Sequence, residues 1–125
     1  MKLKATEKQV QNAISDYLSV NSIIHRRTNS GALKIAKRFV KFAFWMYPQS
    51  NEITEYKILD LDGILPDGKA FFCECKATGK TPDEGQWNTI NFINRETKAV
   101  ALWADSIDMF IEKWNNINNK KQFAF

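Results

Sequence analysis

The chain has 125 residues, of which 44% are hydrophobic, and a formal net charge of +4. This length and apolar content suit one domain with its own core and exclude a disordered chain. No apolar run approaches the roughly 18 residues that a membrane span needs, and the first residues lack the apolar stretch of a signal peptide. We therefore expect a cytoplasmic protein without a membrane partner.

The basic residues are unevenly distributed. No Asp or Glu occurs between Tyr17 and Asn51. Such a stretch is either a solvated basic face or a surface that binds phosphate groups. His25, the only histidine, is interpreted as an ordinary strand residue. The other cationic residues of the stretch are Arg26, Arg27, Lys34, Lys37, Arg38 and Lys41.

The first predicted helix begins near the N-terminus. Thr6 and Gln9 have the spacing of a capping box, and apolar residues follow at helical intervals. A short strand over Ser22–Arg27 and a turn over Thr28–Gly31 come next. The apolar stripe of the helix consists of Val10, Ile14, Tyr17 and Leu18.

The stretch Ala32–Tyr47 has no clear period. Its aromatic and β-branched residues favour a strand. Apolar residues occupy both alternating sets of positions, however, so a helix over Leu33–Phe42 is also open. Pro48–Asn51 has the composition of a loop.

A hairpin is predicted in the middle of the chain. Strands over Lys57–Leu65 and Ala70–Lys76 flank the segment Pro66–Lys69, where Pro, Asp and Gly stand in the order of a tight turn. Cys73 and Cys75 lie two residues apart on the second strand, so their side chains share one face. A lone Cys-x-Cys pair does not suggest a zinc site, and we expect buried free thiols.

The last third of the chain alternates helix and strand. A loop over Thr78–Gly85 leads to a helix from Gln86 to about Arg95, and a strand follows over Ala99–Trp103. Ser106 then caps a last helix, and a polar tail begins near residue 115. The order is helix, three strands, helix, strand, helix (αβββαβα). It predicts an α/β fold with a mixed central sheet flanked by helices.

Three charged residues converge on the predicted hairpin. Asp60 lies on the first strand, and Glu74 and Lys76 lie on the second with their side chains on one face. Because apolar residues surround both acids, burying them is costly unless they are paired or bind a cation. Two carboxylates suit Mg²⁺. A structural Glu–Lys pair is the alternative, and Asp62 is a rival ligand to Asp60.

The segment from Asp60 to Lys76 resembles the core of the PD-(D/E)xK nuclease superfamily, because an acid, a turn and Glu-x-Lys follow one another. Over roughly residues 6–112 the chain resembles the VRR-NUC (virus-type replication-repair nuclease) branch of that superfamily, in its minimal stand-alone phage form. The other segments that carry the likeness are Glu7, Arg27–Gly31, Thr81–Gln86 and Ala99–Phe110.

The resemblance implies a restriction-endonuclease-like core in a single domain over residues 1–125, with a tail over 115–125, and a site for Mg²⁺ or Mn²⁺. Lys76 is then the catalytic cation, Gln86 orients that lysine or the attacking water, and Glu7 binds metal directly or through water. The residues alone also allow Glu7 to serve the helix dipole and Gln86 to be a plain helix residue. The implied metal ligands are Asp60, Glu74, the backbone carbonyl of Cys75, and Glu7.

The function that the resemblance implies is metal-dependent, structure-specific cleavage of DNA that leaves 5′-phosphate ends. Resolution of four-way (Holliday) junctions would require a homodimer, and a phage or prophage in a bacterial host is the expected source. Two alternatives are a restriction-type endonuclease that cuts duplex DNA and a non-catalytic DNA-binding or inhibitory protein on the same fold. The residues expected to contact DNA are Arg27, Asn29, Lys34, Lys37, Arg38 and Lys41.

Overall fold

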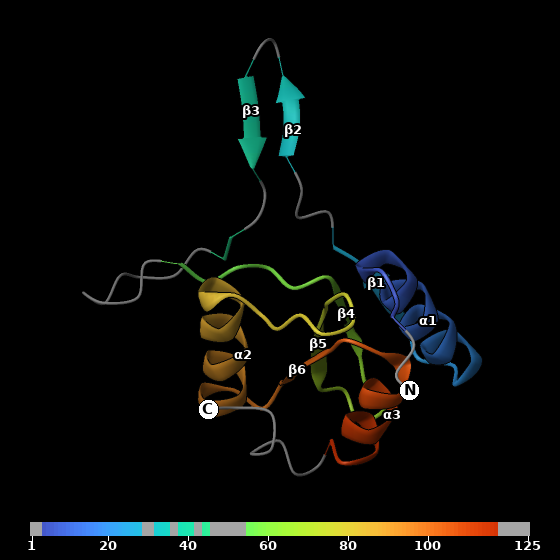
Figure 1. Ribbon diagram of the computed structural model, residues 1–125. Coiled ribbons are helices and arrows are strands. Elements are labelled where there is room, and N and C mark those ends of the chain that lie inside the picture. The colour runs from blue at the N-terminus through green and yellow to red at the C-terminus, as the bar shows by residue number, and fades with distance from the viewer. Residues whose placement is uncertain (1–3, 29–31, 36–37, 42–43, 46–54, 118–125) are drawn as a thin grey trace.

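The computed structural model describes residues 4–28, 32–35, 38–41, 44–45 and 55–117. They form an α/β fold with one four-stranded mixed sheet, one two-stranded sheet and three helices (Figure 1). The helices are α1 (Glu7–Val20), α2 (Glu84–Glu96) and α3 (Ile107–Asn115). The strands are β1 (His25–Arg27), β2 (Ala32–Ile35), β3 (Arg38–Lys41), β4 (Leu61–Ile64), β5 (Ala70–Cys75) and β6 (Val100–Ala104).

The main sheet has the strand order β1-β4-β5-β6. β4 and β5 form the predicted antiparallel hairpin, and β1 adds to β4 in the antiparallel sense. β6 lies parallel to β5, and α2 makes the crossover between them. Leaving β2 and β3 aside, the elements follow the predicted order of helix, three strands, helix, strand and helix.

Two apolar clusters occupy the two faces of this sheet. The larger cluster joins β4, β5 and β6 to α1 and α3, and includes both cysteines, which are buried and free as predicted. Phe71 and Phe110 lie in it with no exposed surface, and both rings pack against Trp114. The smaller cluster lies under α2 and contains Leu59, Ile90, Ile93 and Ala101. The two faces of β5 therefore pack against different apolar clusters.

Local signals set the beginnings of the helices. Thr6 and Gln9 form the predicted capping box of α1, and Ser106 caps α3. The second helix begins two residues before the predicted Gln86, because Asp83 caps it and Gln86 completes a second capping box. An N-terminal cap satisfies amide groups that have no partner inside the helix.

The predicted strand over Lys57–Leu65 is shortened to β4, and Asp60 lies just before it. Single contacts replace a continuous ladder here. Lys57 forms an isolated antiparallel bridge with Phe44, and the Asp60 carbonyl accepts from the Thr28 amide at 2.9 Å. Thr89 donates a hydrogen bond to the Lys57 carbonyl, Thr28 donates one to the Leu59 carbonyl, and Asp60 itself accepts one from β5. These contacts satisfy the backbone without a ladder.

Two other boundaries differ from prediction. The chain turns at Ser22, whose φ is 60°, so the strand predicted over Ser22–Arg27 begins only at His25. Lys76 follows the last residue of β5, although its amide still donates to the Ala104 carbonyl at 2.9 Å.

The ambiguous stretch forms strands rather than a helix where it is described. β2 and β3 pair with each other in the antiparallel sense, as a separate sheet. Figure 1 shows this hairpin standing away from the main sheet. The loop predicted over Pro48–Asn51 lies outside the described residues. None of the described helices is long and apolar enough to cross a membrane.

Candidate metal centre

Three carboxylates meet at one end of the main sheet. Glu7 comes from the first turn of α1, Asp60 from the segment before β4, and Glu74 from β5. One oxygen of each lies within 4.8 Å of the other two. These residues are 53 and 14 positions apart in the sequence, and the hairpin and the packing of α1 bring them together. Asp62 is not in this group, because it pairs with Arg26 at 2.8 Å.

Glu74 is the most enclosed of the three acids, with only 2% of its surface exposed. Its Oε2 accepts a hydrogen bond from the Gln86 side-chain amide at 2.7 Å. No described residue donates to Oε1, which is buried. A buried oxygen without a donor costs free energy unless a proton or a cation satisfies it.

The acids are shifted towards their protonated forms. Burial, the negative charge of Asp60 and a hydrogen bond to Asp60 raise the pKa of Glu74 to about 10, although the Lys76 ammonium opposes this. Burial also raises the pKa of Asp60, against the hydrogen bond from the Cys75 amide. Burial and the charge of Asp60 raise the pKa of Glu7. Without a cation, Glu74 therefore retains a proton near neutral pH.

Asp60 is oriented by the backbone of β5. Its Oδ2 accepts a hydrogen bond from the Cys75 amide at 2.9 Å. The N–H and C=O of one residue point to the same side of an extended strand. The Cys75 carbonyl therefore faces the Asp60 side of β5, while its thiol lies in the larger core.

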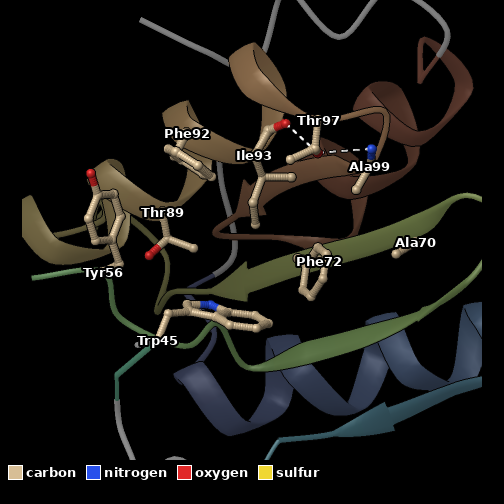
Figure 2. Close-up of a pocket in the computed structure, with 9 residues that line it drawn as sticks. All are labelled: Trp45, Tyr56, Ala70, Phe72, Thr89, Phe92, Ile93, Thr97 and Ala99. Atoms are coloured by element: carbon tan, nitrogen blue, oxygen red, sulfur yellow. Dashed lines mark hydrogen bonds between the residues drawn. The ribbon is translucent and has the colours of Figure 1, made fainter. Parts of the chain in front are cut away.

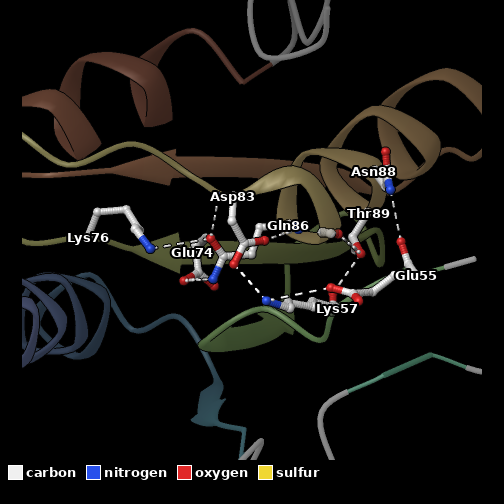
Figure 3. Close-up of polar contacts among 9 residues, drawn as sticks. Glu55, Lys57, Glu74, Lys76, Asp83, Gln86, Asn88 and Thr89 are labelled. Atoms are coloured by element: carbon white, nitrogen blue, oxygen red, sulfur yellow. Dashed lines mark hydrogen bonds and ion pairs between the residues drawn. The ribbon is translucent and has the colours of Figure 1, made fainter.

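Gln86 connects Glu74 to the Lys76 ammonium, as Figure 3 shows. Its amide group donates to Glu74, and its Oε1 accepts from the Lys76 ammonium at 3.3 Å and from the Asp83 backbone amide at 2.9 Å. Gln86 is therefore both a capping residue of α2 and a contact of Glu74 and Lys76. Asp83 also pairs with Lys57 at 2.7 Å, and this ties the start of α2 to the segment before Asp60.

Thr78 fixes the chain at the start of α1. Its backbone amide donates to the Ala5 carbonyl at 3.0 Å, and its hydroxyl accepts from the Ala5 amide at 2.9 Å. The same hydroxyl donates to the Asp105 carbonyl at 3.1 Å. The Asp105 side chain accepts from the Gly79 amide at 2.9 Å. These bonds, which we call the Thr78 clamp, hold the residues that precede Glu7 against the segment that follows Lys76.

The donor set fits a hard divalent cation. Mg²⁺ and Mn²⁺ prefer oxygen ligands, and Mg²⁺ typically uses one or two carboxylates together with water. Asp60 and Glu74 offer such carboxylates, and Glu74 Oε1 is the buried oxygen that lacks a donor. Exposed Glu7 lies at the rim, where it can reach a cation directly or through water.

The structure describes only some of the predicted DNA-contacting residues, and it places those on β1 and on the hairpin of β2 and β3. Arg27 is exposed and donates to Asn12 of α1. Asn29 and Lys37 lie outside the described residues. The Nδ1–H of His25 donates to the Ile23 carbonyl, and its Nε2 bonds to the Ser15 hydroxyl. His25 lies at the start of β1, in agreement with the prediction of a strand residue. The remaining predicted contacts, Lys34 on β2 and Arg38 and Lys41 on β3, belong to the separate hairpin.

Two supporting features were absent from the sequence prediction. The capping role of Asp83 had a local signal, because Asp83 and Gln86 have capping-box spacing. The Thr78 clamp had none, because its partners Ala5 and Asp105 are 73 and 27 residues away.

Comparisons with protein-family models, with curated proteins and with solved structures found no match.

Proposed function

We propose that this protein is a metal-dependent nuclease that hydrolyses DNA phosphodiester bonds. The observation that carries the proposal is the buried Glu74 carboxylate. Its Oε1 has no donor among the described residues, and one of its oxygens lies within 4.8 Å of oxygens of two further acids. The chain's likeness to the PD-(D/E)xK core, and to the VRR-NUC branch in particular, agrees with this chemistry.

In the proposed mechanism, Asp60, Glu74 and the Cys75 carbonyl would hold Mg²⁺ or Mn²⁺, and Glu7 would approach it from the rim. The bound ion would supply a nucleophilic water near neutral pH and neutralise charge on the phosphate. Lys76 places its ammonium beside the phosphate as negative charge develops there. Gln86 holds that ammonium and Glu74 in a fixed relation, because one side chain contacts both.

The finer parts of the proposal concern the substrate and the assembly. We propose structure-specific cleavage, with four-way junctions among the substrates. Two cuts by a chain with one acid cluster among its described residues require a homodimer, which light scattering after gel filtration would test. A cytoplasmic location and an origin in phage or prophage stay predictions.

A cleavage panel tests the central proposal. Labelled four-way junction, flap, single-stranded and duplex DNA would be incubated with Mg²⁺ or Mn²⁺. We expect metal-dependent cleavage, and a loss of about 100-fold or more in Lys76→Ala, which is typical when a group that stabilises transition-state charge is removed. Asp60→Asn should weaken Mg²⁺ binding in calorimetry.

Two variants on the β4–β5 turn serve as matched controls. Asp67→Asn and Lys69→Ala remove an acid and a lysine that are exposed and far from the cluster, so both should cut like wild type. No metal-dependent cleavage of any substrate, or equal cleavage by Lys76→Ala, would contradict the proposal. Cutting at one duplex sequence would favour a restriction-type enzyme, and DNA binding without cutting would favour a non-catalytic protein.

A further inference from the structure

An aromatic pocket lies between β5 and α2, beside the acid cluster. Its volume is about 290 Å³, and Figure 2 shows its walls. The rings of Trp45 and Phe72 pack edge to face at 5.8 Å, and those of Tyr56 and Phe92 do so at 5.6 Å. Trp45 is 44% exposed. A half-exposed tryptophan at the edge of an apolar pocket offers a flat ring surface to a ligand.

The pocket and Glu74 lie on one face of the sheet. Phe72 and Glu74 are two residues apart on β5, so both side chains point to the α2 side, about 7 Å apart along the strand. Thr89 of the pocket lies one helical turn beyond Gln86 on α2. About 7 Å spans two 3.4 Å steps of a stacked strand, so a base in the pocket would belong to a nucleotide within two positions of a phosphate at the acids.

A second hollow adjoins the pocket across the same two rings. Its volume is about 520 Å³, and it shares Trp45 and Phe72 with the pocket. Arg26 lines it with a side chain that is 78% exposed. The one acid among the described residues that line either hollow is Asp62, which Arg26 neutralises at 2.8 Å. No unpaired carboxylate there would repel a phosphate backbone.

We propose that the aromatic pocket binds one unpaired nucleobase of the DNA strand whose phosphate lies at the acid cluster. The proposal rests on the proposed nuclease function and narrows its substrate to DNA with an unpaired nucleotide within two positions of the cleaved bond. A base in a duplex is stacked and paired, so it cannot enter a pocket of this kind without leaving the helix. Stacking on aromatic side chains binds any base, because every base has a π-face.

The test measures binding without cleavage. In EDTA, the protein would be titrated with a short homothymidine strand and with an abasic strand of equal length, which has the same charge but no bases. We expect wild type to bind the thymidine strand at least ten-fold more tightly than the abasic strand. Trp45→Ala should lose on the order of ten-fold for the thymidine strand alone, the usual effect of one stacking contact.

Three further variants make the result decisive. Trp45→Phe should retain most of the preference, and Phe72→Leu, which alters the opposite ring, should lose it. Val20→Ala removes an exposed apolar side chain at the end of α1 and should behave as wild type. Circular dichroism would show that each variant is folded.

Equal affinity of wild type for the two strands, or an unchanged preference in Trp45→Ala, would overturn the proposal. It would also be overturned if Trp45→Ala changed only self-association in light scattering, because the occupant would then be a second copy. A base preference without metal-dependent cleavage would support the pocket and refute the nuclease. Cleavage without a base preference would support the nuclease and refute the pocket.

Discussion

At the scale of single residues, Gln86 combines helix capping with contacts to two residues of the site. One amide group caps α2, donates to Glu74 and accepts from Lys76. A substitution at Gln86 alone would confuse helix stability with site geometry. Asp83 separates the two effects, because it caps the same helix and is not bonded to Glu74.

We predict that Gln86→Ala and Asp83→Ala each lower the free energy of unfolding by about 1 kcal/mol, the usual cost of losing a cap. Only Gln86→Ala should also slow metal-dependent cleavage, by about 10-fold or more, because Lys76 and Glu74 lose their common partner. Chemical denaturation and cleavage rates at saturating substrate measure the two effects. Equal loss of activity in both variants would mean that Gln86 acts through the helix only.

At the scale of elements, the Thr78 clamp sets the position of α1 relative to β5 and β6. Glu7 is the only one of the three acids that α1 contributes. Its distance from Asp60 and Glu74 therefore depends on how the start of α1 is held. The Ala5 and Asp105 hydrogen bonds of the Thr78 hydroxyl provide that link.

We predict that Thr78→Val weakens Mg²⁺ binding by about three- to ten-fold, a coupling typical of contacting residues. In a Glu7→Gln background the same substitution should have little effect, because the residue that the clamp positions is already disabled. Calorimetric titration of all four proteins gives this double-mutant cycle. Additive losses in the cycle would refute the link to Glu7.

Thr97→Val is the matched control for the clamp. The Thr97 hydroxyl also makes two hydrogen bonds to backbone, to the Ile93 carbonyl at 2.7 Å and from the Ala99 amide at 3.0 Å, at the far end of α2. Its removal should cost similar stability, on the order of 1 kcal/mol, and leave Mg²⁺ affinity unchanged.

The elements that could be predicted were those with local signals. Thr6 and Ser106 cap helices through contacts three residues away, so their pattern is visible in the sequence. The turn after β4 was visible for the same reason. The start of β4 just after Asp60 could not be predicted. There the Asp60 carboxylate replaces a ladder partner through a contact 15 residues away. The pairing of β2 with β3 was hidden by apolar residues on both alternating sets.

Some residues of the site could also be predicted from local signals, and others could not. Asp60, Glu74 and Lys76 could be placed together from the spacing across one hairpin. Bringing Glu7 to them depends on the packing of α1, and the resemblance to a nuclease family suggested it where geometry could not. Trp45 drew no functional interpretation from the sequence, because an aromatic residue within an apolar stretch is ordinary until its exposure is known.

At the scale of the whole molecule, the acid cluster makes stability depend on pH and on metal. The pKa of Glu74 is about 10 in the folded protein, against an ordinary value of 4.5, and those of Asp60 and Glu7 are also raised. Between pH 4.5 and about 10, Glu74 has lost its proton in the unfolded chain but retains it in the folded chain. The free energy of unfolding contributed by these groups therefore falls as pH rises through that window.

The substitution Glu74→Gln should remove most of the dependence of the free energy of unfolding on pH. The amide is neutral at every pH, can still accept from Gln86, and can donate to Asp60 as a protonated Glu74 would. We predict that the Tm of the variant in EDTA is close to that of wild type near pH 5 and several degrees higher near pH 8. A difference of 1 kcal/mol corresponds to about 3–5 °C in a domain of this size.

Near pH 8, Mg²⁺ should reverse the order of the Tm values of wild type and Glu74→Gln. The cation binds deprotonated carboxylates of the folded state, so it should raise the wild-type Tm more near pH 8 than near pH 6. Glu74→Gln should gain little from Mg²⁺ at either pH, whereas Asp67→Asn, which changes an exposed acid on the turn, should follow wild type. Thermal melts in EDTA and in Mg²⁺ across this pH range provide the measurement. If wild type and Glu74→Gln shared one pH slope and one response to Mg²⁺, Glu74 would be neither the buried proton acceptor nor the principal ligand, and the site would have to be sought elsewhere.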